Sequence, residues 1–259
     1  MAVILEVQQL SCGYKFPIIS EISFEAGPGD VVCILGVNGI GKTTLFKTIL
    51  GQIPGFGGRA LIGGRDLSKT PIKQLARMIG YVPQAHIPPF PYRVIDVVTT
   101  GRTPHLSLFS APSRRDEEFA LEVLERLQIG DLAERVYTEI SGGERQLVLI
   151  ARALAVEPDI LIMDEPASNL DFGNQMRMIR QIRMLAETGL AVLLTSHNPD
   201  HVLQCATKIV LLYGGRRYAV GSPDELITGE MLREVYSIEA EVKQFERGEK
   251  TSRVCIPWL

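Results

Sequence analysis

The chain has 259 residues, of which 46% are hydrophobic and 22% charged, and its net charge is −3. This composition excludes an intrinsically disordered chain and gives no basic footprint for nucleic acid. The longest apolar runs, such as Val31–Leu35, span only a few residues, whereas a membrane-spanning helix needs about 20. The N-terminus shows no secretory signal, and the four cysteines are widely spaced without a CxxC pair. We therefore expect a protein of the reducing cytoplasm without a disulfide framework.

Short apolar segments alternate with helical patterns along most of the chain. Strands are expected at residues 3–9, 31–35, 60–62, 77–82, 160–163, 191–195 and 209–213. Helices are expected at residues 42–50 and 175–187, and also after Ser113 and Ser141, each of which precedes an acidic residue by three positions. This alternation predicts an α/β fold with a mostly parallel sheet and helices on its faces.

The prolines at positions 88, 89 and 91 separate the α/β pattern from a helical one. We therefore expect an α/β core at about residues 1–84 and 158–221, interrupted by a helical insert at about residues 85–157. Residues 222–259 are expected to form a small C-terminal appendage.

A glycine-rich segment follows the apolar run Val31–Leu35. Residues 36–43 read Gly-Val-Asn-Gly-Ile-Gly-Lys-Thr and match the pattern GxxxxGK[ST] between a predicted strand and a predicted helix. The glycines let backbone N–H groups surround phosphate oxygens, Lys42 adds a full positive charge, and the Thr43 hydroxyl is a ligand for Mg²⁺. The alternative, a plain glycine turn before a surface lysine, is disfavoured by this context. The candidate nucleotide-binding residues are Gly36, Asn38, Gly39, Gly41, Lys42, Thr43 and Thr44.

An acidic pair ends the predicted strand at residues 160–163. Asp164 is placed to hold Mg²⁺, directly or through water, and Glu165 to polarise a water that attacks the γ-phosphate. Acidic pairs also end strands simply because they are solvated, but the phosphate loop upstream favours the chemical interpretation.

Four motifs occur in one fixed order: the phosphate loop, the segment Ser-Gly-Gly-Glu-Arg-Gln at residues 141–146, the pair Asp164-Glu165, and His197. This set resembles the ATP-binding subunits of ATP-binding cassette (ABC) transporters over roughly residues 3–221. The resemblance implies a P-loop NTPase core with a mostly parallel sheet, an antiparallel β element near the N-terminus and a helical subdomain insert. It also implies an ATPase that uses ATP and Mg²⁺.

The resemblance further implies that nucleotide lies between two copies of the chain, arranged head to tail. The residues that would face the partner's nucleotide are Ser141, Gly142, Gly143 and Glu144, and Asp171 lies in a loop that crosses the interface. The other interpretation is an ordinary capping box at Ser141 and Glu144, and the two are compatible, since Glu144 can cap the helix while Ser141 faces the partner. By the same resemblance, Tyr14 stacks on adenine, Gln84 touches Mg²⁺ or the attacking water, and His197 contacts the γ-phosphate.

Residues 100–106 and the run Ser-Arg-Arg-Asp at residues 113–116 resemble importer ATPases for iron-siderophore chelates, haem, cobalamin or molybdate. The implied partners are two transmembrane permease subunits and, indirectly, a substrate-binding protein, but no nucleic acid. The implied location is peripheral, on the cytoplasmic face of the inner membrane. Two alternatives stay open: an ABC-type ATPase without a permease, and a regulatory module that does not hydrolyse ATP.

The insert also carries a cluster of apolar residues. We expect a groove for a cytoplasmic permease helix between about residues 86 and 113, with packing inside the insert as the alternative. The apolar residues concerned are Phe90, Tyr92, Leu106, Leu108 and Phe109.

Overall fold

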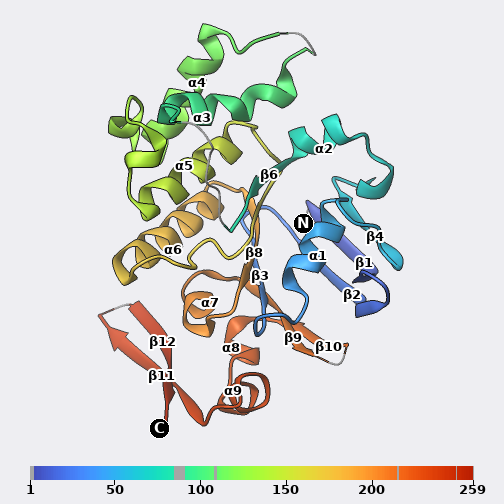
Figure 1. The fold of residues 1–259 in the computed structure, drawn as a ribbon. Coiled ribbons are helices and arrows are strands. Elements are labelled where there is room, and N and C mark those ends of the chain that lie inside the picture. Colours follow the sequence, from blue (N-terminus) through green and yellow to red (C-terminus); the bar gives the residue numbers. More distant parts are fainter. Residues whose placement is uncertain (1–2, 85–90, 108–109, 215, 249, 259) are drawn as a thin grey trace. The chain divides into compact units, whose positions relative to one another are not determined.

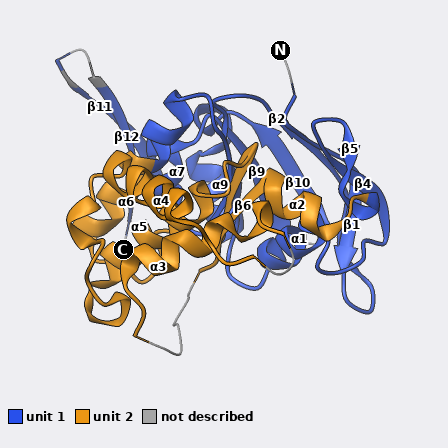
Figure 2. Cartoon of the chain, turned by 90° about the horizontal axis from the view of Figure 1, so that it is seen from above, with its two compact units in different colours: residues 1–69, 182–259 blue, residues 70–181 orange. Residues whose placement is uncertain are grey.

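The computed structural model describes residues 3–84, 91–107, 110–214, 216–248 and 250–258. The chain forms two compact units, which Figure 2 shows in different colours. Unit 1 comprises Met1–Lys69 and Ile182–Leu259, and unit 2 comprises Thr70–Gln181. The domain boundaries expected from the sequence stay a prediction.

An antiparallel sheet in unit 1 has the strand order β2-β1-β4-β5. β1 (Leu5–Gly13) pairs with β2 (Pro17–Ala26) on one side and with β4 (Gly57–Ile62) on the other, and β5 (Arg65–Asp66) follows β4. The antiparallel element near the N-terminus is thereby confirmed. The sequence patterns did not indicate β2, whose alternation of buried side chains is broken between Ile19 and Ile22, where Glu21 has a positive φ of 53° and the register with β1 shifts.

The parallel strands of unit 1 follow the sequence prediction closely. β3 (Val31–Leu35) lies between β8 (Ala191–Ser196) and β9 (Lys208–Gly214) and is parallel to both. Every side chain of β3 and β8 is buried, as expected for central strands covered on both faces. β10 (Arg217–Gly221) pairs antiparallel with β9.

Helices and a hairpin complete unit 1 (Figure 1). α1 (Lys42–Ile49) follows β3, and α7 (Pro199–Cys205) follows β8. The C-terminal segment adds α8 (Pro223–Leu226), α9 (Gly229–Tyr236) and the antiparallel hairpin of β11 (Ala240–Arg247) and β12 (Lys250–Pro257). Within the described residues, no helix has both the length and the apolar character that crossing a membrane requires.

Unit 2 combines two parallel strands with several helices. β6 (Ile79–Val82) pairs with β7 (Ile160–Met163). The expected strand at residues 77–82 begins two residues late, because Arg77 and Met78 end the helix α2 (Ile72–Met78). The remaining elements are α3 (Val94–Thr99), α4 (Arg114–Arg126), α5 (Gly142–Leu154) and the start of α6 (Phe172–Glu187), with short 3₁₀ turns at Thr100–His105, Gly130–Leu132 and Tyr137–Glu139.

The two predicted capping boxes are confirmed. The Ser113 side chain accepts a hydrogen bond from the Asp116 amide at the start of α4, and the Ser141 side chain accepts one from the Glu144 amide at the start of α5. In both boxes the acidic side chain accepts a hydrogen bond from the amide of the capping serine. These contacts fix where α4 and α5 begin.

The apolar cluster expected to line a permease groove is only partly described. Phe90, Leu108 and Phe109 lie outside the described residues. Tyr92 is exposed and Leu106 is half-buried.

Candidate functional site

The glycine-rich loop at residues 36–43 connects β3 to α1 in unit 1. Gly39 and Gly41 have φ angles of 80° and 114°, in the left-handed region that favours glycine. A β-carbon at Gly36 would lie 3.2 Å from the carbonyl oxygen of Leu212, so a side chain there would press against the neighbouring strand β9. The loop therefore needs its glycines both for backbone conformation and for space.

Lys42 is buried within this loop. The residue is 5% exposed, and Nζ donates hydrogen bonds to the carbonyl oxygens of Gly36 (2.8 Å) and Val37 (3.1 Å). Thr43 is exposed in the first turn of α1, whereas Thr44 is buried. The loop thus holds the ammonium group against two of its own carbonyl oxygens, and the hydroxyl-bearing Thr43 follows Lys42 at the helix N-terminus. This arrangement suits the terminal phosphates of a nucleotide.

Two exposed aromatic side chains lie at the turn between β1 and β2. Tyr14 and Phe16 are each 66% exposed. Gly13 makes the turn possible, because a β-carbon there would lie 2.0 Å from the carbonyl oxygen of Phe16. β2 then packs against the phosphate loop, since a β-carbon at Gly41 would lie 3.2 Å from the Cδ1 atoms of Ile18 and Ile19.

His197 follows β8 and lies near the start of the same loop. The amide of Gly36 donates to the carbonyl oxygen of Ser196 at 3.4 Å, which joins the first loop residue to the residue before His197. His197 itself is exposed. The segment after it is held by Asn198, whose amide donates to Ser196 Oγ (3.0 Å) and whose side chain caps α7.

Unit 2 brings three predicted residues together at the ends of β6 and β7. The amide of Asp164 donates to the carbonyl oxygen of Val82 (2.9 Å), and Asp164 as a whole is 5% exposed. Nε2 of Gln84 lies 3.4 Å from Oε2 of Glu165. Glu165 has a φ of 45°, an uncommon conformation for a residue with a side chain.

Ser168 belongs to this group but was missed by sequence reasoning. Its hydroxyl donates to the carbonyl oxygen of Glu165 (2.8 Å) and accepts from Gln84 Nε2 at 3.4 Å. A serine three residues after the acidic pair was the available signal, because Ser side chains commonly bond the backbone of a turn.

The segment Ser141–Glu144 forms the N-terminus of α5. Ser141 and Gly142 are exposed, whereas Gly143 is buried. Hydrogen bonds from the Ser141 hydroxyl and the Ser141 amide lower the pKa of Glu144. The carboxylate is therefore engaged in its own helix cap, and the first turn of the helix presents exposed backbone next to the Ser141 side chain.

Asp171 caps the beginning of α6. Its two carboxylate oxygens accept from the backbone amide of Asn174 (2.9 Å) and from the Asn174 side-chain amide (2.7 Å). These hydrogen bonds lower the pKa of Asp171. The roles assigned to Asp171 and to the other site residues stay predictions, whereas their local geometry is now defined.

Comparison with known proteins gives consistent matches along the chain. Residues 19–168 match the ABC transporter family. An uncharacterized ABC transporter ATP-binding protein of Haemophilus influenzae is 41% identical over 92% of this chain and 91% of its own length. A hemin import ATP-binding protein of Hahella chejuensis is 36% identical over 87% of this chain and 89% of its own length.

Two further matches concern import and structure. A molybdate import ATP-binding protein of Haemophilus influenzae is 33% identical over 90% of this chain and 88% of its own length. A solved ABC transporter in an inward-facing conformation, described as of metal-chelate type, is 31% identical with a TM-score of 0.89, covering 99% of this chain and 98% of the solved one.

Proposed function

The chain belongs to the ABC transporter family as an ATP-hydrolysing subunit of an importer, and on this premise we propose how its residues divide the work. We propose a metal chelate or a related compound as the transported substrate: an iron-siderophore complex, haem, cobalamin or molybdate. The support is the likeness to the hemin and molybdate import proteins and to the solved transporter of metal-chelate type.

In unit 1, the phosphate loop holds the nucleotide. Lys42 neutralises the β- and γ-phosphates, and backbone amides between Gly36 and Thr43 bind their oxygens. Tyr14 provides a flat surface for adenine, which its 66% exposure supports. His197 contacts the γ-phosphate from the end of β8. Asn38, Gly39 and Thr44 complete the set of loop residues that we assign to the nucleotide.

The side chains predicted from the sequence to bind Mg²⁺ all carry oxygen ligands, which suit this ion. Thr43 offers an exposed hydroxyl, Asp164 a carboxylate and Gln84 an amide oxygen, which are hard ligands of the kind Mg²⁺ prefers. When bound, the ion would neutralise charge on the phosphates. Small numbers of protein ligands are usual for Mg²⁺, because nucleotide phosphates and water complete its coordination.

In unit 2, Glu165 acts as the general base for hydrolysis. Its carboxylate polarises the attacking water, and Gln84 orients the same water, since Gln84 Nε2 and Glu165 Oε2 lie 3.4 Å apart. The hydrogen bond from Ser168 to the Glu165 backbone supports the turn that carries this carboxylate.

A second copy of the chain completes each site. The N-terminus of α5, formed by Ser141, Gly142, Gly143 and Glu144, binds the γ-phosphate held by the other copy, and Asp171 lies at the same interface. The exposed Ser141 and Gly142 at the start of a 13-residue helix carry this proposal, because an exposed helix N-terminus attracts anions. Two such sites form in a head-to-tail homodimer.

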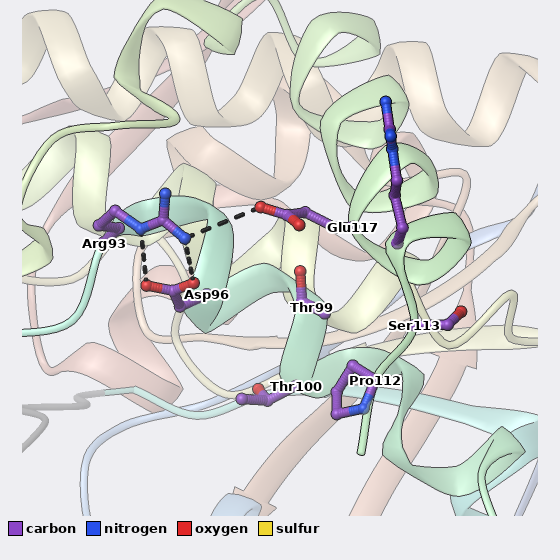
Figure 3. A pocket seen from close by; sticks show the side chains of 8 residues that line it. Arg93, Asp96, Thr99, Thr100, Pro112, Ser113 and Glu117 are labelled. Carbon is purple, nitrogen blue, oxygen red and sulfur yellow. Dashed lines mark hydrogen bonds and ion pairs between the residues drawn. The ribbon is translucent and has the colours of Figure 1, made fainter. Parts of the chain in front are cut away.

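The permease partners are proposed to bind at a pocket in unit 2 (Figure 3). It has a volume of about 460 Å³ and is lined by Arg93, Asp96, Thr99, Thr100, Pro112, Ser113, Arg114 and Glu117. Arg93 pairs with Asp96 (2.9 Å), Glu117 (3.7 Å) and Glu134 (3.0 Å), so three carboxylates surround one guanidinium. We propose that a cytoplasmic helix of the permease carrying charged side chains of both signs fits this surface, because its lining holds two arginines, Arg93 and Arg114, and two carboxylates, Asp96 and Glu117.

The permease places the subunit on the cytoplasmic face of the inner membrane as a peripheral protein. A substrate-binding protein would act on the permease from the other side of the membrane. The α/β core at about residues 1–84 and 158–221 would bind and hydrolyse nucleotide, and the helical insert at about 85–157 would contact both the permease and the second copy. Residues 222–259 would remain an appendage to the core.

The experiment that tests the shared site is Ser141→Arg. Each copy should still bind ATP through its own phosphate loop, but hydrolysis should fail because the arginine occupies the place of the partner's γ-phosphate. The control is Ser222→Arg, which removes an equivalent capping box at the start of α8. Hydrolysis by Ser141→Arg at the wild-type rate, independent of protein concentration, would refute the head-to-tail site.

A further inference from the structure

The side chain of Asn174 lies between two segments that the proposed function places at the dimer interface. It projects from the first turn of α6, and its Nδ2 donates to Oδ2 of Asp171 at 2.7 Å. Its amide carbon also lies over the first turn of α5, where a β-carbon at Gly143 would be 2.5 Å from Asn174 Cγ. α5 and α6 lie close together in unit 2 (Figure 1).

This contact explains why a glycine stands at position 143. Gly143 lies in the first turn of α5, where any residue adopts the backbone conformation, so backbone freedom is not the reason. The Asn174 amide occupies the space that a side chain would need, with Oδ1 at 2.6 Å and Nδ2 at 2.9 Å from the β-carbon position. By contrast, a β-carbon at Gly142 would meet no atom of the described residues within 4 Å.

The charge of Arg177 on α6 acts on a carboxylate in each of the same two segments. Arg177 lies three residues after Asn174, one helical turn along α6. Its positive charge helps to lower the pKa of Glu144 in the first turn of α5 and the pKa of Asp171, in both cases after the hydrogen bonds that dominate. One face of α6 therefore contacts both segments, through a close steric contact and through charge.

We propose that Asn174 is a positioning residue for ATP hydrolysis. It fixes the position of residues 141–144 relative to the Asp171 carboxylate. Both groups can then reach the nucleotide bound by the second copy at the same time. Asn174 touches no reacting atom in this role. The inference rests on the proposed function, in which residues 141–144 complete the site of the other copy.

The test begins with Asn174→Ala in the full chain. We expect ATP binding by each copy to change less than about twofold, because the phosphate loop belongs to unit 1, while kcat falls about 10- to 100-fold, the loss that small misplacements of a site produce. The matched control is Arg180→Ala, an exposed residue on the same helix, which should keep the wild-type kcat. A wild-type kcat for Asn174→Ala would overturn the proposal.

A second pair of variants tests the contact directly. Gly143→Ala should reduce kcat strongly, because the new methyl group collides with Asn174. In the Asn174→Ala background the same change should cost much less, since the space is then open. Equal losses in both backgrounds would show that the contact has no role. If Asn174→Ala fails to fold, Asn174→Asp replaces it in the test. This variant keeps the shape of the side chain but puts a negative charge where the donor to Asp171 was. Wild-type turnover in Asn174→Asp would equally overturn the inference.

The proposed function and this inference fail in distinguishable ways. If Ser141→Arg hydrolyses ATP normally, the shared site itself is wrong. If Ser141→Arg is inactive while Asn174→Ala keeps its kcat, only the positioning role of Asn174 is wrong.

Discussion

Nε2 of Gln84 lies 3.4 Å from Oε2 of Glu165 and equally far from Oγ of Ser168. Gln84 follows β6 and Glu165 follows β7, and these parallel strands end at the same edge. The carboxylate that we assign to water activation thus lies beside an amide at the entrance to the helical insert. A change in the insert that moves Gln84 would therefore reach the catalytic carboxylate through one side-chain contact.

Glu165→Gln tests the assignment of the general base. The variant should bind ATP normally and hydrolyse it about 10²- to 10⁴-fold more slowly, the usual contribution of a general base. It should also accumulate as an ATP-bound dimer, which size-exclusion chromatography with ATP detects. Lys42→Ala provides the contrast, because it should weaken ATP binding itself by removing the charge that faces the phosphates. Normal turnover in Glu165→Gln would show that another group activates the water.

Tyr14→Ala tests the adenine contact. Loss of one stacked aromatic ring costs about 1–3 kcal/mol per base, so the Kd for ATP should rise about 5- to 150-fold while kcat at saturation changes little. Tyr14→Trp should restore binding. Phe16→Ala is the matched control, since Phe16 is equally exposed at 66% in the same turn. A larger loss from Phe16→Ala than from Tyr14→Ala would reassign the stacking residue.

The C-terminal hairpin is fastened to the helix that follows His197. The backbone amide of Cys255 in β12 donates to Oδ1 of Asp200 at 2.8 Å, and Asp200 lies in the first turn of α7. Asp200→Ala should lower the free energy of unfolding by about 1.5–3 kcal/mol, the usual value for a hydrogen bond to a charged group. Asp200→Asn keeps an oxygen acceptor and should lose less. Urea unfolding measures both, and equal stability of all three chains would show that this hydrogen bond contributes nothing.

Much of the fold was predictable because its central strands are continuous apolar runs. β3 and β7 coincide with the expected segments. The caps at Ser113 and Ser141 were predictable because each serine is followed three residues later by an acidic residue. β11 and β12 were not predictable in the same way, because most of their side chains are exposed or half-buried and show no clear alternation.

The residues of the candidate site were likewise predictable only in part. The phosphate loop and the Asp164-Glu165 pair are contiguous motifs, so the sequence alone could nominate them. Ser168 and Asn174 act through contacts with residues whose positions only the folded chain defines, namely Gln84 and Gly143. A serine three residues after the acidic pair indicates a bond to nearby backbone at most, and neither it nor an asparagine in a helix identifies these distant partners.

We expect the protonation of His201 to lower the free energy of unfolding in mild acid. Burial lowers the pKa of His201 below its ordinary value of 6.5, the charge of His197 lowers it further, and Asp200 opposes both. The unfolded chain therefore takes up a proton near pH 6.5, whereas the folded chain resists it until a lower pH. The stability that neutral His201 contributes is complete above pH 6.5 and is lost as the pH falls toward the pKa of the folded state.

The measurement is the Tm of wild type and His201→Gln between pH 7.5 and pH 5.5. Glutamine cannot take up this proton, so the Tm of His201→Gln should fall less over that range, even if the variant is less stable at pH 7.5. All other titrating groups are shared, so the difference between the two curves isolates position 201. Parallel curves would mean that His201 binds its proton equally well in the folded and unfolded chains, and that its burial has no consequence for acid stability.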